Sequence, residues 1–250
     1  MNQKFLSSDR ILSKLDEYLH KNDYASAERH LNYWLAEAQY VGDERTELLL
    51  QNERMGLYRK LGKREQALDC ACAAMASIER QGISHQVGAA TTLLNCATVY
   101  KAFGMSDTAL PIFEQARTVY ERELEPSDGR LGGLYNNMGL CFVDLRRFEE
   151  AKELYRRAIA IMERIEGGAA EAAITELNFA SAAEAELGAM DADEIIQRYL
   201  QSAEERLESV TEWDGNYAFV CEKCASVFEY YGHFFYANEL KERARRIYGQ

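Results

Sequence analysis

Small and aromatic side chains recur along the chain at a spacing of about 42 residues. The pattern is clearest in residues 134–158, which contain Gly139, Phe142, Phe148, Ala151, Tyr155 and Ala158. The equivalent places one repeat earlier hold Ala97, Tyr100, Ala109, Phe113 and Ala116, and two repeats earlier Met55, Tyr58, Ala67, Ala71 and Ala74. The match weakens after residue 174, where Asp193 stands in place of an alanine, and it recovers at Ala225 and Phe228.

The spacing inside each repeat predicts two helices packed face to face. Ala151 and Ala158 lie seven residues apart, which places them two turns apart on one face of a helix. Gly139 and Phe142 lie about one turn apart on the preceding helix. One pair of helices cannot bury this stripe alone, so successive pairs must stack. The sequence therefore predicts an all-α fold of about six antiparallel helix pairs.

This pattern resembles the tetratricopeptide repeat (TPR) family, through the set Gly139, Phe142, Ala151, Tyr155 and Ala158 and its copies. The repeat length and the phrase Leu-Tyr-Asn-Asn-Met-Gly are most similar to the longer repeats of kinesin light chain. The resemblance covers roughly residues 8–248. It implies a right-handed superhelical solenoid in which the first helix of each pair lines a concave groove. We therefore expect a single TPR-like repeat domain over residues 1–250, with units near 8–47, 48–89, 90–131, 132–173, 174–217 and 218–250.

The charge of the chain argues against several classes of partner. The formal net charge is −12, whereas binding to nucleic acid or to an anionic membrane requires a cationic surface. The sequence contains no run of ~18 apolar residues and no secretory signal. Six cysteines in 250 residues do not make a disulfide framework. We therefore expect a cytoplasmic protein that binds neither nucleic acid nor membranes.

The cysteines are the main candidates for metal chemistry. Cys221 and Cys224 form a CxxC motif, and Cys70 and Cys72 form a CxC motif. A zinc site would need two such pairs brought together, or histidines at ligand spacing. Cys221 and Cys224 occupy core positions of the repeat, so we interpret them as small apolar residues, with a metal site and a redox pair as the alternatives. Common catalytic and nucleotide-binding motifs are absent from the sequence, so we expect no enzyme activity, no cofactor and no metal.

Two asparagines are the candidate peptide-binding residues of the groove. Asn95 and Asn137 occupy the same position of successive first helices, a position that the resemblance assigns to the groove. An asparagine amide can both donate to and accept from an extended peptide backbone. Glu53, beside Arg54, takes this position one unit earlier, and Phe179 takes it one unit later. The position just before it holds Asn52, Asn136 and Asn178. The alternative is that Asn95 and Asn137 satisfy neighbouring backbone or side-chain groups.

Aromatic residues are concentrated near the C-terminus. Tyr230, Tyr231, Phe235 and Tyr236 exceed what one helix pair needs for its core. They form a candidate patch for homo-oligomer formation or for a partner. The alternative is that they pack the last unit onto the unit before it.

The expected function is that of a scaffold or adaptor that binds another protein or a peptide segment in its groove. One alternative is a peptide-sensing regulator, similar to quorum-sensing proteins built from such repeats. The few residues before the first repeat and after the last disfavour the added effector domain that such regulators usually have. Another alternative is an enzyme on a helical-repeat scaffold, which the absence of a catalytic motif disfavours.

Overall fold

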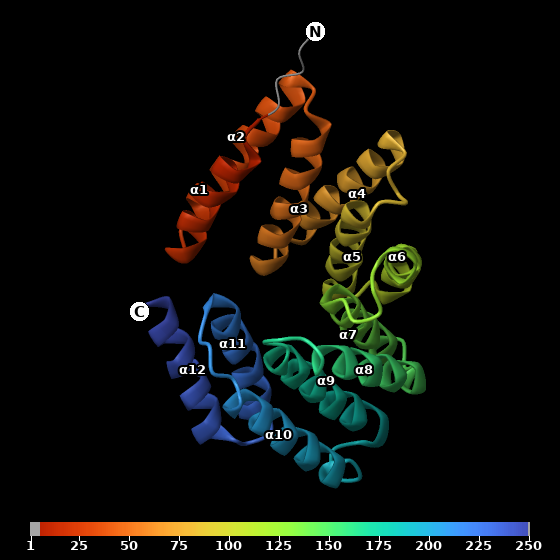
Figure 1. Ribbon diagram of the computed structural model, residues 1–250, viewed down its shortest axis with the longest axis vertical. Coiled ribbons are helices and arrows are strands. Elements are labelled where there is room, and N and C mark those ends of the chain that lie inside the picture. Colours follow the sequence, from red (N-terminus) through yellow and green to blue (C-terminus); the bar gives the residue numbers. More distant parts are fainter. Residues whose placement is uncertain (1–5, 250) are drawn as a thin grey trace. The chain divides into compact units, whose positions relative to one another are not determined.

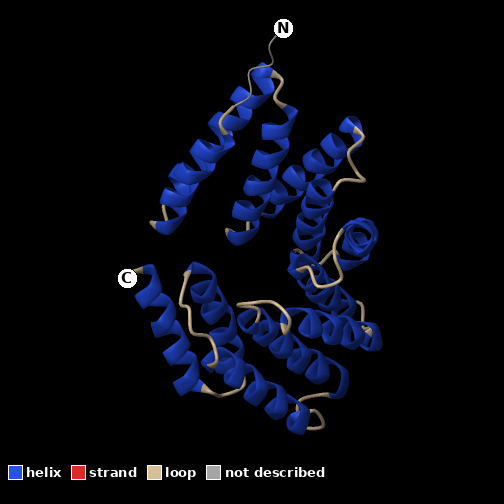
Figure 2. Ribbon diagram, in the orientation of Figure 1, coloured by secondary structure: helices blue, strands red, loops and turns tan. Residues whose placement is uncertain are grey.

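The structure is helical throughout the part of the chain that it describes. The computed structural model describes residues 6–249, which form twelve helices and no strand (Figure 1, Figure 2). The helices are α1 (Ser8–His20), α2 (Tyr24–Val41), α3 (Glu44–Lys60), α4 (Arg64–Gln81), α5 (Val87–Ala102), α6 (Ser106–Glu123), α7 (Gly129–Asp144), α8 (Phe148–Met162), α9 (Ala169–Leu187), α10 (Asp193–Glu208), α11 (Gly215–Tyr230) and α12 (Phe234–Tyr248). This confirms the predicted all-α class. None of these described helices combines the length and the hydrophobicity that crossing a bilayer demands.

The chain divides into two compact units, and each is described by itself. Unit 1 spans Met1–Arg122 and unit 2 spans Glu123–Gln250. In unit 1, α3 packs along α4, and α5 contacts both helices. In unit 2, the closest packing joins α7 with α8, α9 with α10, and α11 with α12. Helix α9 also contacts α7 and α11, so the first helices of successive pairs are neighbours. The single domain with six units at the bounds given above stays a prediction.

Short acidic side chains set the starts of several helices. Asp43 precedes α3, and its carboxylate accepts hydrogen bonds from the Thr46 backbone N–H at 3.1 Å and from the Leu6 N–H at 2.9 Å. Asp214 precedes α11 and accepts from the Tyr217 N–H at 2.8 Å. These bonds satisfy backbone donors that the first turn of a helix leaves unpaired. They fix where each helix starts and therefore the register at which it meets its neighbours.

The core of unit 2 contains a close approach between α7 and α8. Gly139 on α7 lies against the ring of Tyr155, which is fully buried. A Cβ atom at Gly139 would lie 2.7 Å from Tyr155 Cδ1 and closer still to Cε1, so only glycine leaves room for the ring. Ala151 and Ala158 lie on either side of Tyr155 along α8 and are also fully buried. The recurring small and aromatic residues are therefore the contact surface between the two helices of this pair.

We expect the Gly139→Ala substitution to lower the free energy of unfolding by about 1–3 kcal/mol, because the new methyl group overlaps a ring that the core holds in place. Gly133→Ala, on the same helix, is the matched control, since nothing lies within 4 Å of a Cβ atom there. It should raise the free energy of unfolding by about 0.5–1 kcal/mol, because alanine has the higher helix propensity. Urea unfolding followed by circular dichroism measures both values. Equal effects of the two substitutions would contradict the close approach.

Candidate peptide-binding face

The first helix of each central pair leaves one stripe of its surface outside the core. On α5, Leu93, Cys96 and Ala97 are buried, whereas Leu94 and Asn95 are partly exposed. Helices α3, α7 and α9 repeat this arrangement, with partly exposed amides at Asn52, Asn136, Asn137 and Asn178. The stripe therefore presents amide groups next to a closely packed core, on a surface that a ligand can reach.

In unit 1 an amide pair joins α3 to α5. Asn95 Nδ2 donates a hydrogen bond of 2.9 Å to Asn52 Oδ1. Asn52 in turn hydrogen-bonds to the carboxylate of Glu53. Burial is the main reason that the pKa of Glu53 is raised, and the nearby Asp16 carboxylate raises it further. Glu53 and the amide pair thus form one polar group on the exposed stripe of this unit.

Unit 2 contains a second amide pair, which also joins two neighbouring first helices. Asn178 Nδ2 on α9 donates a hydrogen bond of 2.9 Å to Asn136 Oδ1 on α7. Asn137, the neighbour of Asn136, instead donates from Nδ2 to the Gly133 carbonyl of its own helix at 2.8 Å. The bond between α7 and α9 thus comes from the position before the one that the resemblance assigns to the groove.

The predicted groove residues include Asn95 of the first pair and neither member of the second. The other members of the two pairs are Asn52, Asn136 and Asn178. A signal for them was present, because the two members of each pair lie 43 and 42 residues apart, which is the repeat length. Within each unit, the two asparagines of a pair meet across the contact between neighbouring first helices.

Two other predicted groove residues, Phe179 and Arg54, each contact an aromatic ring. Phe179 is 6% exposed, and its ring stacks on that of Tyr199 with 4.4 Å between centroids. This packing places the ring in the core and not in a groove, which corrects the sequence-based expectation. Arg54 is half-buried on α3, where its guanidinium donates to Gln51 Oε1 at 3.0 Å and lies over the Tyr58 ring. The guanidinium of Arg54 therefore contacts side chains of its own helix.

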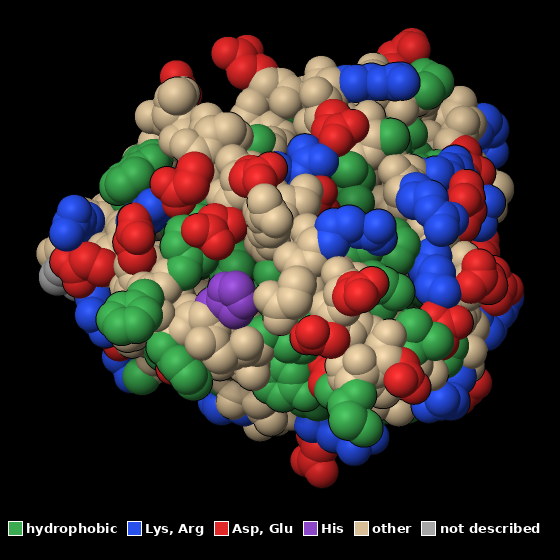
Figure 3. Space-filling model, turned by 90° about the horizontal axis from the view of Figure 1, so that it is seen from below, with side chains coloured by type: hydrophobic (Ala, Val, Ile, Leu, Met, Phe, Trp, Pro, Cys, Tyr) green, Lys and Arg blue, Asp and Glu red, His purple; other side chains and the backbone are tan. Residues whose placement is uncertain are grey.

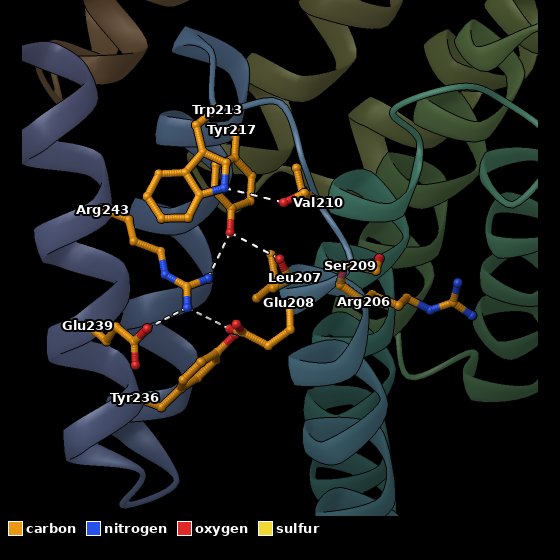
Figure 4. A network of polar contacts seen from close by, with 10 residues as sticks. All are labelled: Arg206, Leu207, Glu208, Ser209, Val210, Trp213, Tyr217, Tyr236, Glu239 and Arg243. Carbon is orange, nitrogen blue, oxygen red and sulfur yellow. Dashed lines mark hydrogen bonds and ion pairs between the residues drawn. The ribbon is translucent and has the colours of Figure 1, made fainter.

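A polar network joins the last three helices of the chain (Figure 4). The Arg243 guanidinium on α12 donates to the Tyr217 hydroxyl at 3.0 Å, to Glu208 Oε1 at 2.7 Å and also to Glu239. The guanidinium carbon lies 5.3 Å from the centroid of the Trp213 ring. Arg243 is 6% exposed, so these partners compensate the cost of burying its charge. The network fixes the connection between α10 and α11 against α12.

The four residues of the predicted association patch have different surroundings. Tyr236 belongs to the polar network, because its hydroxyl donates a 2.8 Å hydrogen bond to a carboxylate there. Tyr230 and Tyr231 donate their hydroxyls to Glu184 on α9, at 3.0 and 2.8 Å. Phe235 is 96% exposed. Self-association through these residues stays a prediction.

The cysteines are free thiols, and all except Cys72 are buried. Within residues 6–249, no group of three or more histidine, cysteine, aspartate or glutamate side chains is arranged to hold a metal ion. Burial raises the pKa of the Cys96 thiol to about 12, and it raises the pKa values of Cys221 and Cys224 as well. Buried thiols that stay protonated are poor nucleophiles. The CxxC motif therefore lies in the core of unit 2.

The helix pairs match a known family of repeats. Residues 48–122 and residues 133–162 each match a profile described as tetratricopeptide repeat. These two segments are therefore tetratricopeptide repeats, as the recurring small and aromatic residues predicted.

Solved structures share this fold at low sequence identity. BtubC (BKLC) from P. vanneervenii is 19% identical, with a TM-score of 0.68 and 82% of each chain covered. A putative kinesin light chain of Podosopora anserina, with nearly identical TPR-like repeats, is 17% identical, with a TM-score of 0.55 and coverage of 80% of this chain and 94% of that one. NprR in complex with its cognate peptide NprX is 17% identical, with a TM-score of 0.61 and coverage of 94% and 65%, respectively. No curated protein sequence matches the chain. Identities this low establish the fold alone.

We expect Arg243→Met to lower the free energy of unfolding by about 2–3 kcal/mol, because it removes a buried donor that one hydroxyl and two carboxylates share. Arg246→Met is the matched control one turn away, since the side chain of Arg246 is 69% exposed and forms an ion pair with Glu242 on the same helix. Its effect should stay below about 0.5 kcal/mol. Chemical denaturation compares the two variants, and equal losses would contradict a stabilising role of the network.

Iodoacetamide should modify Cys72 at least about tenfold faster than any other cysteine of the native protein, because Cys72 alone is exposed. Peptide mass spectrometry after timed quenching measures the rate at each thiol. Unfolding in guanidinium chloride is the control, in which all six cysteines should react at similar rates. Native labelling of Cys96 or Cys224 as fast as that of Cys72 would contradict the burial of these thiols.

Proposed function

We propose that the chain is a scaffold that binds a protein or peptide segment along the first helices of its repeats, and that it acts by binding and not by catalysis. The two asparagine pairs are the observation that supports this proposal most. Each pair joins the exposed stripes of two neighbouring first helices, Asn52 with Asn95 in unit 1 and Asn136 with Asn178 in unit 2. Each unit thus contains one amide pair between neighbouring first helices, outside the buried core.

An amide pair suits an extended peptide backbone. The bond inside the second pair uses one donor and one acceptor, so the Asn136 amino group and the Asn178 carbonyl remain for a ligand. An extended peptide offers N–H and C=O groups in alternation. Because the two asparagines hold each other in place, little side-chain freedom is lost when a ligand binds. The pair would therefore bind main chain rather than one particular side chain.

The partner that we propose is another protein or a peptide. The net charge of −12 disfavours nucleic acid and anionic membranes. A cytoplasmic location is our inference from the cysteines, because all six are free thiols and a reducing compartment keeps them so.

A peptide-sensing regulator is the second candidate function. The similarity that favours it is to NprR, which was solved with a bound peptide and covers 94% of this chain. The chain spans about two thirds of the length of that protein, so the activity of NprR as a whole is not transferred. A regulator must adopt a different state when the peptide binds, and a change in oligomeric state is one such difference, whereas a scaffold need not change. Light scattering with and without peptide distinguishes the two.

Peptide selection followed by affinity measurement tests the proposed binding face. Random displayed peptides are selected on the purified chain, and calorimetry gives the Kd of the tightest one. Replacing Asn136 and Asn178 together by alanine should weaken that Kd by about tenfold or more if the peptide lies on unit 2, because two main-chain hydrogen bonds contribute about 1–3 kcal/mol. Replacing Asn52 and Asn95 should do the same for a peptide on unit 1.

Exposed asparagines on second helices provide the matched controls. Asn32 lies on α2 and Asn238 on α12, one in each unit. Asn32→Ala and Asn238→Ala should leave the Kd within about twofold of wild type, since an exposed side chain outside the binding face contributes little. Circular dichroism confirms that all variants keep their helicity. An unchanged Kd in both amide-pair variants would contradict the proposal.

A further inference from the structure

Unit 2 has a cleft at the end of its first helices, beyond the amide pair. It has a volume of about 490 Å³ and lies where the end of α9, the start of α10 and the end of α11 meet. Its lining includes Glu184, Asp193, Ile196, Gln197, Tyr230 and Tyr231. Figure 3 shows acidic side chains next to hydrophobic ones across the face seen from below in Figure 1. The cleft thus combines carboxylates, aromatic rings and an aliphatic side chain.

Two tyrosines hold one carboxylate of the cleft in place. The Tyr230 hydroxyl donates to Glu184 Oε1 at 3.0 Å, and the Tyr231 hydroxyl donates to Glu184 Oε2 at 2.8 Å. The two rings meet edge to face, with 4.9 Å between their centroids. Both oxygens keep further acceptor capacity, because a carboxylate oxygen can accept more than one hydrogen bond. The carboxylate is therefore oriented before any ligand arrives.

The negative charge of this cleft is not balanced within the described chain. Among residues 6–249, neither Glu184 nor Asp193 forms an ion pair with lysine, arginine or histidine. Nearby acidic side chains do form them, since Glu186 pairs with Lys152 at 2.6 Å and Glu229 pairs with a lysine of α12 at 2.7 Å. Glu184 and Asp193 thus lack the cationic partners that Glu186 and Glu229 have.

The pKa values of Tyr230 and Tyr231 are both raised. The hydrogen bond to Glu184 is the main reason that the pKa of Tyr230 is raised. Burial, and then the same carboxylate, raises the pKa of Tyr231. Both hydroxyls therefore stay protonated and remain donors to Glu184, which fixes the position of its carboxylate.

We propose that this cleft binds the side chain of a lysine or arginine from a partner protein. The cation would lie near the carboxylates of Glu184 and Asp193 and against the tyrosine rings, whose faces attract positive charge. Its alkyl stem would pack on Ile196, which is 3% exposed, and on Met190, which is next to the lining residue Ala189 and 92% exposed. This site would recognise a side chain, in addition to the main-chain binding proposed above. Its contacts are those of Tyr230 and Tyr231 with Glu184, and they do not involve the amide pair.

Aromatic NMR of the full chain with ¹³C-labelled tyrosine tests this site. The probe is Nα-acetyl-lysine methylamide, its neutral control is the norleucine analogue, and Tyr230→Phe and Tyr231→Phe assign the two ring signals. The lysine probe should shift both signals saturably, with a Kd on the order of millimolar, as expected for one small cation. The norleucine probe should leave them in place. Equal shifts with norleucine would overturn the proposal, as would no shift with lysine.

Charge-neutralising variants identify the groups responsible. Glu184→Gln and Asp193→Asn should each weaken lysine binding by about fivefold or more. Asp193→Asn leaves the tyrosine bonds to Glu184 intact, so its effect does not depend on the packing of those rings. Glu194→Gln is the matched control, because this neighbouring acid is exposed and does not line the cleft.

The control variants also separate this site from the amide pair. Glu194→Gln should change lysine affinity by no more than about twofold, and an equal loss there would overturn the proposal in favour of a diffuse charge effect. The double replacement of Asn136 and Asn178 by alanine should leave lysine binding unchanged. Loss of lysine binding in that variant would overturn the cleft as an independent site, whereas loss of the selected peptide alone concerns only the proposed binding face.

Discussion

The contact between Gly139, which has no side chain, and the buried ring of Tyr155 sets the geometry of the helix pair α7–α8. Gly139 lets the Tyr155 ring lie against the backbone of α7, and the alanines beside Tyr155 let the two helices come together along their length. The distance between the helices then follows from the ring and not from a layer of longer side chains. With that distance fixed, one face of the first helix is buried and a stripe of the opposite face is left outside.

The amide pairs follow from this constraint and from the repeat length. When successive pairs stack with the same geometry, residues one repeat apart lie at the same level on neighbouring first helices. Asn136 and Asn178 are 42 residues apart and reach hydrogen-bond distance across α7 and α9. Asn52 and Asn95 are 43 apart, one residue more than the repeat, and also reach hydrogen-bond distance across α3 and α5. Each asparagine–asparagine hydrogen bond thus depends on the register at which the core packs the two first helices.

The sequence predicted the helix pairs, but it did not decide which side chains of each helix face outward, because that depends on the rotation of the helix about its axis. The repeat predicted the helix pairs because small and aromatic residues form the contact that defines them. It did not decide between Asn136 and Asn137, because adjacent residues differ by about 100° around the helix axis and the stripe is broad enough to include both. Phe179 illustrates the same limit, since it occupies the groove position of the repeat but turns into the core. The Arg243 network was not predicted, because its partners come from three helices with no common spacing.

Affinity and selectivity have different sources in such a molecule. An asparagine that binds main chain accepts nearly any sequence, because every peptide offers the same N–H and C=O groups. Selectivity must then come from side-chain sites, where a wrong group leaves a charge unpaired. In unit 2 the carboxylate of Glu184 lies about two turns after Asn178 on the same first helix, α9, and Asp193 lies at the start of α10. A partner whose main chain follows the asparagines would be distinguished from others by a cation placed at that end.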